Sequence, residues 1–181
     1  MKNKAIFFLL FMFFISQSFD ENLNIQSLNI TIDKKTKTTI FKNQVSAKDE
    51  KNNQLLTEFA EYNKNLELLK TVGKTTLLTS EGFVVESKDV IFDNNKNYIR
   101  SDYPTTIKDL EKNIIYLDSF EYSTQDSFFK SAGNIEVLDS QKNKYNFSQI
   151  YIDEKKKEIV GTDSKAFLNQ ESFKIEKNNK P

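Results

Sequence analysis

The chain has 181 residues, enough for one domain of roughly 150 residues once a targeting segment is set aside. Basic and acidic side chains number 26 each, so the composition carries no electrostatic footprint for nucleic acid. Cysteine and histidine are both absent, which excludes disulfides, Cys/His and Ser/His nucleophile systems and the usual zinc sites. An enzyme would have to work with carboxylates, Lys, Ser or Tyr alone, and we expect no catalytic residues, no metal site and no cofactor.

The first residues have the layout of a signal peptide. Lys2 and Lys4 precede an unbroken apolar run over 5–15, and Ser16 and Ser18 supply the small residues that precede a cleavage point. This run of 11 residues is too short for a membrane span, which needs about 20. We predict a signal peptide at 1–18, cleaved after Ser18, and an exported domain at 19–181 with a net charge of −2, from 24 basic and 26 acidic side chains. A retained N-terminal anchor is the alternative.

An internal repeat is the main signal in the remaining chain. Apolar doublets of the form apolar-x-apolar recur every 30 residues, at Ile30/Ile32, Ala60/Tyr62, Val90/Phe92, Phe120/Tyr122 and Ile150/Ile152. A polar group of turn-forming residues follows each doublet. A second set lies about half a period away, at Val45/Ala47, Thr75/Leu77, Thr105/Ile107 and Ile135/Val137. The residues just before this set are Asn43, Gly73, Tyr103 and Gly133, and the Gly and Asn among them indicate a bend with an unusual backbone conformation.

Each 30-residue unit therefore contains two alternating apolar runs, which predicts two strands per unit and an all-β fold. The stretch 55–69 also fits an amphipathic helix, but its doublet at residues 60 and 62 is in phase with the four others, so we assign it to strands. Two strands cannot bury their apolar face alone, and we expect stacked units to share one continuous core.

The last part of the chain is irregular. The segment 173–178 resembles the earlier doublet and turn, but it follows Ile150 by 23 residues instead of 30. We interpret it as a shortened unit, and the ending just past a turn, at Pro181, as a sign that the domain continues beyond the given C-terminus.

Five segments resemble the organic-solvent-tolerance (OstA-like) family of lipopolysaccharide-transport proteins. They are Ala60-Glu61-Tyr62-Asn63, Val72-Gly73-Lys74-Thr75, Val90-Ile91-Phe92-Asp93, Ala132-Gly133-Asn134-Ile135 and Ile150-Tyr151-Ile152-Asp153, and their phase relation covers roughly residues 28 to 175. The family includes LptA, LptC and the periplasmic N-terminal domain of LptD. The chain departs from the family pattern at Asn43 and at Tyr103-Pro104, where Gly is usual.

The resemblance implies a repeat-built, V-shaped β-jellyroll in the periplasm that shields the acyl chains of lipopolysaccharide between two sheets. It implies lipopolysaccharide as the ligand and other OstA-like β-jellyroll proteins as partners, joined by stacking of edge strands. Length favours an LptA-like component, whereas the ending favours an N-terminal piece of LptD, with outer-membrane association.

The candidate lining of the groove consists of the in-phase apolar positions of both sets: Ile30, Ile32, Val45, Ala47, Ala60, Tyr62, Leu77, Val90, Phe92, Ile107, Phe120, Tyr122, Ile135, Val137, Ile150 and Ile152. The alternative is a structural or adhesive β-solenoid in which the same residues fill a dry core without a lipid ligand. A carbohydrate-active β-helix enzyme would need a recurring ridge of carboxylates, and none recurs at the 30-residue period. Ser127 and Lys130 match a Ser-x-x-Lys nucleophile motif, but Lys130 shares its repeat position with Lys70 and Arg100, which indicates a repeated surface charge.

Overall fold

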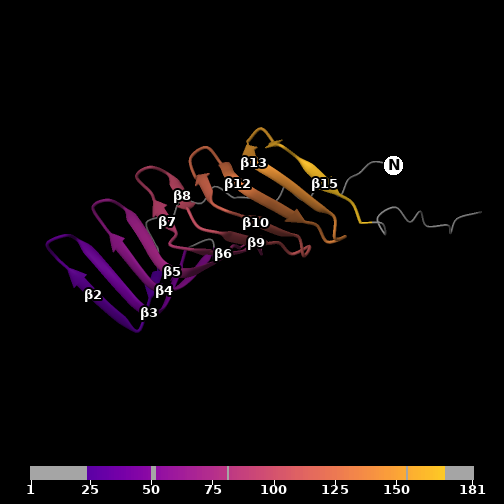
Figure 1. Ribbon diagram of the computed structural model, residues 1–181. Helices are drawn as coiled ribbons and strands as arrows, with labels where there is room; N and C mark the ends of the chain where they lie inside the picture. The colour runs from indigo at the N-terminus through magenta and orange to yellow at the C-terminus, as the bar shows by residue number, and fades with distance from the viewer. Residues whose placement is uncertain (1–23, 50–51, 81, 154, 170–181) are drawn as a thin grey trace, which may run out of the picture.

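The computed structural model describes residues 24–49, 52–80, 82–153 and 155–169. These residues form 15 strands, paired antiparallel in one sheet, and Figure 1 shows them as a stack of hairpins from the indigo β2 to the orange β13. The strands are β1 (Asn24–Gln26), β2 (Asn29–Asp33), β3 (Thr38–Lys48), β4 (Gln54–Asn63), β5 (Leu68–Leu78), β6 (Val84–Lys88), β7 (Ile91–Asp93), β8 (Tyr98–Ser101), β9 (Thr105–Lys108), β10 (Ile114–Leu117), β11 (Phe120–Ser123), β12 (Phe128–Leu138), β13 (Lys144–Asp153), β14 (Glu158–Thr162) and β15 (Lys165–Phe167). The all-β prediction is confirmed, and the stretch 55–69 belongs to β4 and β5 as assigned. The predicted signal peptide and the segment 173–178 lie outside the described residues.

Five long strands bend halfway and divide the sheet into two layers. The register of β3 against β4 shifts between Lys42 and Val45, and that of β12 against β13 shifts between Ala132 and Ile135. Beyond the bend each half has different neighbours: the start of β5 pairs with β7, and its end pairs with β6. We call β2, β7, β8, β11 and β14, with the halves of the long strands that they continue, the first layer, and β1, β6, β9, β10 and β15, with the other halves, the second layer.

Left-handed backbone conformations recur with the 30-residue period and explain how a chain with few glycines turns so often. The turns of the first layer place one residue each at positive φ, at Lys37, Glu67, Asn97, Ser127 and Lys157. In these turns a side-chain oxygen at the start accepts backbone N–H bonds, as Asp33 does from Lys35 at 2.8 Å. The turns of the second layer do the same at Asn52, Gly82, Lys112 and Lys142.

The bend itself matches the predicted positions in three of four units. Asn43 (φ 64°), Gly73 (φ 82°) and Gly133 (φ 112°) are all left-handed, as expected. At the fourth position the sequence has Tyr103, which is neither Gly nor Asn, and its φ is not positive. The strand stops instead, with β8 ending at Ser101 and β9 beginning at Thr105, because Pro104 has no N–H to continue the ladder.

The middle of the stack therefore has no continuous strand across the bend. β6 and β7 are separated at residues 89–90, β8 and β9 at 102–104, and β10 and β11 at 118–119. We call these three gaps together the central break. On either side of it the long strands β3, β4, β5, β12 and β13 connect the layers directly.

Candidate functional site

The structure brings most of the predicted lining residues into one core between the two layers. Two of the 16 are only partly buried, Tyr62 and Leu77, and two are exposed, Ile30 and Ile32. The other 12 are buried: Val45, Ala47, Ala60, Val90, Phe92, Ile107, Phe120, Tyr122, Ile135, Val137, Ile150 and Ile152. Cross-strand pairing places Tyr62, Phe92, Tyr122 and Ile152 in one row of the first layer, connected through Leu69, Ile99 and Phe129 on the intervening strands.

The inner face is left open at the N-terminal end of the stack. Ile30 pairs with the buried Phe41, and Ile32 with Thr39, so both point to the same side as the core. Their side chains are nevertheless 53% and 65% exposed, because β2 pairs within the described residues only with β3. The first layer thus presents an unfilled apolar surface at this end.

An apolar hollow lies between the layers in the middle of the stack. It has an empty volume of about 620 Å³, counted out to the open solvent. Five predicted residues line it, Leu77, Phe92, Ile107, Phe120 and Tyr122, together with Val85 and Ile99 and, at the tips of the second layer, Asn53, Gln54, Leu78 and Thr79. The hollow is partly open to solvent, and its accessible lining is almost wholly apolar.

The interior becomes polar toward the bend. The inner row of the second layer next to the bend contains hydroxyls in its middle, at Thr57, Thr75, Ser87 and Thr105. They are buried and bonded: Ser87 and Thr105 share a hydrogen bond of 2.7 Å, and Thr75 donates to Thr71 of the first layer at 2.6 Å. A buried hydroxyl that keeps its hydrogen-bond partner costs little stability, so this polar strip is tolerated in the interior, and the apolar rows lie nearer the tips.

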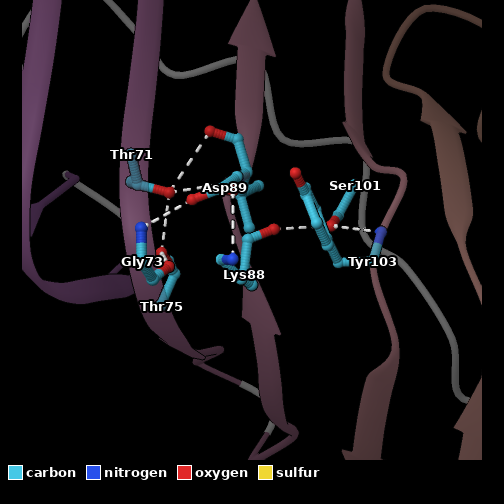
Figure 2. A network of polar contacts seen from close by, with 8 residues as sticks. Thr71, Gly73, Thr75, Lys88, Asp89, Ser101 and Tyr103 are labelled. Carbon is cyan, nitrogen blue, oxygen red and sulfur yellow. Dashed lines mark hydrogen bonds and ion pairs between the residues drawn. The ribbon is translucent and has the colours of Figure 1, made fainter.

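Side chains hold the layers together where the strands are interrupted (Figure 2). The Asp89 carboxylate accepts the N–H of Gly73 at 2.6 Å, and the Ser101 hydroxyl donates to the carbonyl of Lys88 at 2.7 Å. The ammonium of Lys88 lies 4.8 Å from the centre of the Tyr103 ring. On the other side of the central break, Asp118 accepts the N–H of Asn134 at 2.8 Å.

The outward faces carry charge in alternating sign. Lys130 forms an ion pair of 2.8 Å with Glu121 and is exposed, in agreement with a surface role. Glu86 bridges Lys108 at 2.9 Å and Lys74 at 3.3 Å, and hydrogen bonds from these two ammonium groups hold the pKa of its carboxyl below the usual value. No group of three residues suited to a metal ion occurs in the described part of the chain, and no helix there is long and apolar enough to cross a membrane.

Sequence analysis missed a ladder of Asp and Asn residues in the turns of the second layer, all of them buried except the partly buried Asp109. In three turns an Asp accepts the backbone N–H and the side-chain amide of an Asn four residues later: Asp49 with Asn53, Asp109 with Asn113, and Asp139 with Asn143. Each Asn side-chain carbonyl then accepts a backbone N–H from the next unit, that of Ser80, Ser140 and Asn169 respectively. The signal was present as Asp-x-x-x-Asn at residues 49, 109 and 139, but the unit at residue 79 has Thr and Phe instead.

Comparison with protein-family models finds no match, and comparison with curated proteins finds no relative. Among solved structures, the chain is similar to LptH, the LptA-homologous periplasmic component of the lipopolysaccharide transport device of Pseudomonas aeruginosa. The two are 10% identical, the match covers 82% of this chain and 95% of that chain, and the TM-score is 0.33. At these values the likeness carries nothing about the ligand of this chain.

Proposed function

We propose that this protein is a periplasmic lipid-carrying module that shields the acyl chains of lipopolysaccharide on their way to the outer membrane. It acts by binding and not by catalysis, it needs no cofactor, and an LptA-like component and an N-terminal domain of LptD are the two forms that it can represent. The choice of lipopolysaccharide as the ligand is based on the resemblance of the sequence to OstA-like proteins.

One observation carries the proposal: the open apolar hollow between the layers, lined by Leu77, Phe92, Ile107, Phe120 and Tyr122. In a structural solenoid with a dry core we would expect no empty space beside Phe92, Phe120 and Tyr122. Protein interiors pack to the density of organic crystals, and empty space lowers the free energy of unfolding. The 12 buried lining residues are therefore divided in role: those around the hollow contact lipid, and those toward the ends of the stack hold the layers together.

A lipid ligand needs an apolar hollow because its acyl chains are costly to expose to water. Exposing an acyl chain to water costs about 0.8 kcal/mol per CH₂, or on the order of 10 kcal/mol for a dozen carbons. A multi-chain lipid cannot cross an aqueous compartment at that cost. An apolar cleft that is partly open to solvent removes much of the barrier while the polar headgroup stays in water.

The ends of the stack favour partners of the same kind. Within the described residues, β1 and β2 pair only with β3, and β14 and β15 only with β13, which leaves an unpaired backbone edge at each end. Such edges are templates for strand addition, and proteins that keep them open normally use them. The exposed Ile30 and Ile32 at one end would continue the apolar surface into a neighbouring OstA-like domain.

Site-specific photo-crosslinking in cells tests the proposal. Phe92 lines the hollow, and its neighbour Ile91 points to the other face of β7. A photo-reactive residue at Phe92 should capture lipopolysaccharide, and one at Ile91 should capture little. Equal capture at both positions, or none at either, would support the structural β-solenoid with a dry core.

A further inference from the structure

The turns of the first layer contact one another along the stack. A backbone N–H of one turn donates to a carbonyl of the turn before it, from Lys64 to Lys37 at 3.0 Å, from Asn94 to Glu67 at 3.1 Å and from Thr124 to Asn97 at 2.8 Å. The donors recur every 30 residues, and so do the acceptors. At the open ends of the stack the equivalent groups are the N–H of Lys34 and the carbonyl of Lys157. A domain of the same fold that adds a strand to β2 would therefore place its last first-layer turn against residues 33–37.

The turn at the N-terminal end is the most basic of the first-layer turns. Residues 33–37 contain three Lys and one Asp, a net charge of +2, and residues 153–157 at the other end contain three Lys, one Asp and one Glu, a net charge of +1. The turns between them are neutral at 63–67 and 93–97 and carry −1 at 123–127. Stacking two copies of this chain end to end would bring its two basic turns together, and like charges that face each other disfavour such a contact.

The charge of the N-terminal turn is not neutralised by its neighbours. The Asp33 carboxylate accepts the backbone N–H groups of Lys35 at 2.8 Å and Thr36 at 3.3 Å. In the part of the chain that the structure describes, the three ammonium groups of this turn form no ion pair. The adjoining inner face of β2 exposes Ile30 and Ile32. A partner at this end thus meets an apolar strip bordered by unpaired positive charge.

We propose that the open edge of β2 accepts a partner domain of the same stacked-hairpin fold whose last turn is acidic, and that the basic turn at 33–37 disfavours a second copy of this chain. This inference rests on the proposed function, in which strand addition joins like domains, and adds the chemistry that selects the partner. Main-chain bonds and the apolar contact of Ile30 and Ile32 are available to any such domain. The charge of the turn is what distinguishes one partner from another.

A variant of this chain can provide the acidic turn. Lys155→Glu together with Lys157→Glu changes the net charge of residues 153–157 from +1 to −3 and keeps the ion pair of 2.9 Å between Lys156 and Asp153. Each molecule of this acidic-turn variant then has a basic turn at one end and an acidic turn at the other. Sedimentation velocity at about 0.01 M salt, where the Debye length is about 30 Å, should show a monomer for the unmodified protein and self-association at least about tenfold tighter for the variant. About 1 M salt should reverse the association, because the Debye length falls to about 3 Å.

Two further variants show whether the charge acts at the N-terminal turn. Adding Lys34→Glu and Lys35→Glu to the acidic-turn variant changes residues 33–37 from +2 to −2, so both ends become acidic and the association should be lost. The matched control is Lys112→Glu with Lys142→Glu in the otherwise unmodified protein, the same change of charge on exposed turns in the middle of the stack, which should remain a monomer.

Photo-crosslinking locates the contact. A photo-reactive residue at Ile32 should link two molecules of the acidic-turn variant, and one at the exposed Tyr116, on the outer face of the second layer, should link none. Four results would overturn the proposal: unmodified protein that associates as tightly as the acidic-turn variant, a variant that stays monomeric, association that survives acidic charge at both ends or appears in the control, and no link at Ile32. None of these measurements involves lipid, so capture of lipopolysaccharide at Phe92 decides the proposed function separately.

Discussion

Asn113 offers a test of whether the Asp/Asn ladder joins successive units. It is 2% exposed, its amide donates to Asp109 at 2.6 Å, and its carbonyl accepts the N–H of Ser140 at 2.8 Å, 27 residues further along the chain. Asn113→Ala removes both bonds and keeps the backbone bond to Asp109. A bond to a charged group contributes about 1.5–3 kcal/mol and a neutral one about 0.5–1.5 kcal/mol, so the free energy of unfolding should fall by about 2–4 kcal/mol.

Urea denaturation followed by circular dichroism measures this loss. With a slope of about 1–3 kcal/mol per molar, typical of small proteins, the midpoint should fall by about 1 M or more at an unchanged slope. Asn95→Ala is the control: its amide also donates to another unit, to the carbonyl of Leu66 at 2.9 Å, but it is exposed, and water can replace the bond. The control should lose less than about 0.5 kcal/mol. A loss equally small for Asn113→Ala would refute the view that the buried ladder holds the units in register.

Three further predictions concern the bend, the outer charges and the open end. Gly133→Ala should destabilise the protein more than Gly73→Ala. Both glycines have positive φ, but a Cβ at Gly133 would lie 2.7 Å from a carboxylate oxygen of Asp118, while one at Gly73 meets nothing within 4 Å. The urea midpoint of Gly133→Ala should therefore be the lower of the two. Glu86→Gln should cost under about 1 kcal/mol at pH 7, and the difference should vanish on acidification, because a carboxyl with a lowered pKa loses its stabilising effect as the pH falls from 4.5 through that pKa. Ile152→Ala should cost about 2–5 kcal/mol, whereas Ile32→Ala, in the same inner row but 65% exposed, should cost little in thermal or urea unfolding.

The 30-residue doublets predicted two neighbouring inner rows of the first layer well. Ala60/Tyr62, Phe120/Tyr122 and Ile150/Ile152 all lie on the inner face of the first layer, because a fixed repeat length with a polar turn at one place brings each doublet to the same height in the stack. The alternation alone predicted that they would be buried, and all are except Tyr62, which is partly buried. What the pattern could not show is where the stack ends, which is why Ile30 and Ile32 share the pattern and remain exposed.

About half of the residues in the inner rows were not predicted from the sequence, although they recur with nearly the same period. The return strands of the hairpins place Phe41, Leu69, Ile99, Phe129 and Ile159 in the first layer, and Leu55, Val85, Ile115 and Tyr145 in the second, all 28 to 30 residues apart. Their partners two residues away are often Thr, Ser or Gly, so the apolar alternation disappears from the sequence. These small polar residues lie at the bend, where they bond one another, a role that depends on the bulge and not on hydropathy.

The central break explains why the hollow lies in the middle of the stack. At both ends, continuous strands such as β3 and β12 cross the bend, so the distance between the layers is set by covalent backbone and its ladder. In the middle no continuous ladder crosses the bend, and single backbone bonds, such as that of Thr71 to Val90, act together with the side-chain bonds of Asp89 to Gly73 and of Asp118 to Asn134. Widening the interior there requires the loss of a few hydrogen bonds worth about 1–3 kcal/mol each, whereas widening an end would disrupt the ladders of strands that continue across the bend. The large side chains of Phe92, Phe120 and Tyr122 line the hollow in this part of the stack, so the proposed ligand would meet the most aromatic surface where the layers have the fewest ladder bonds between them.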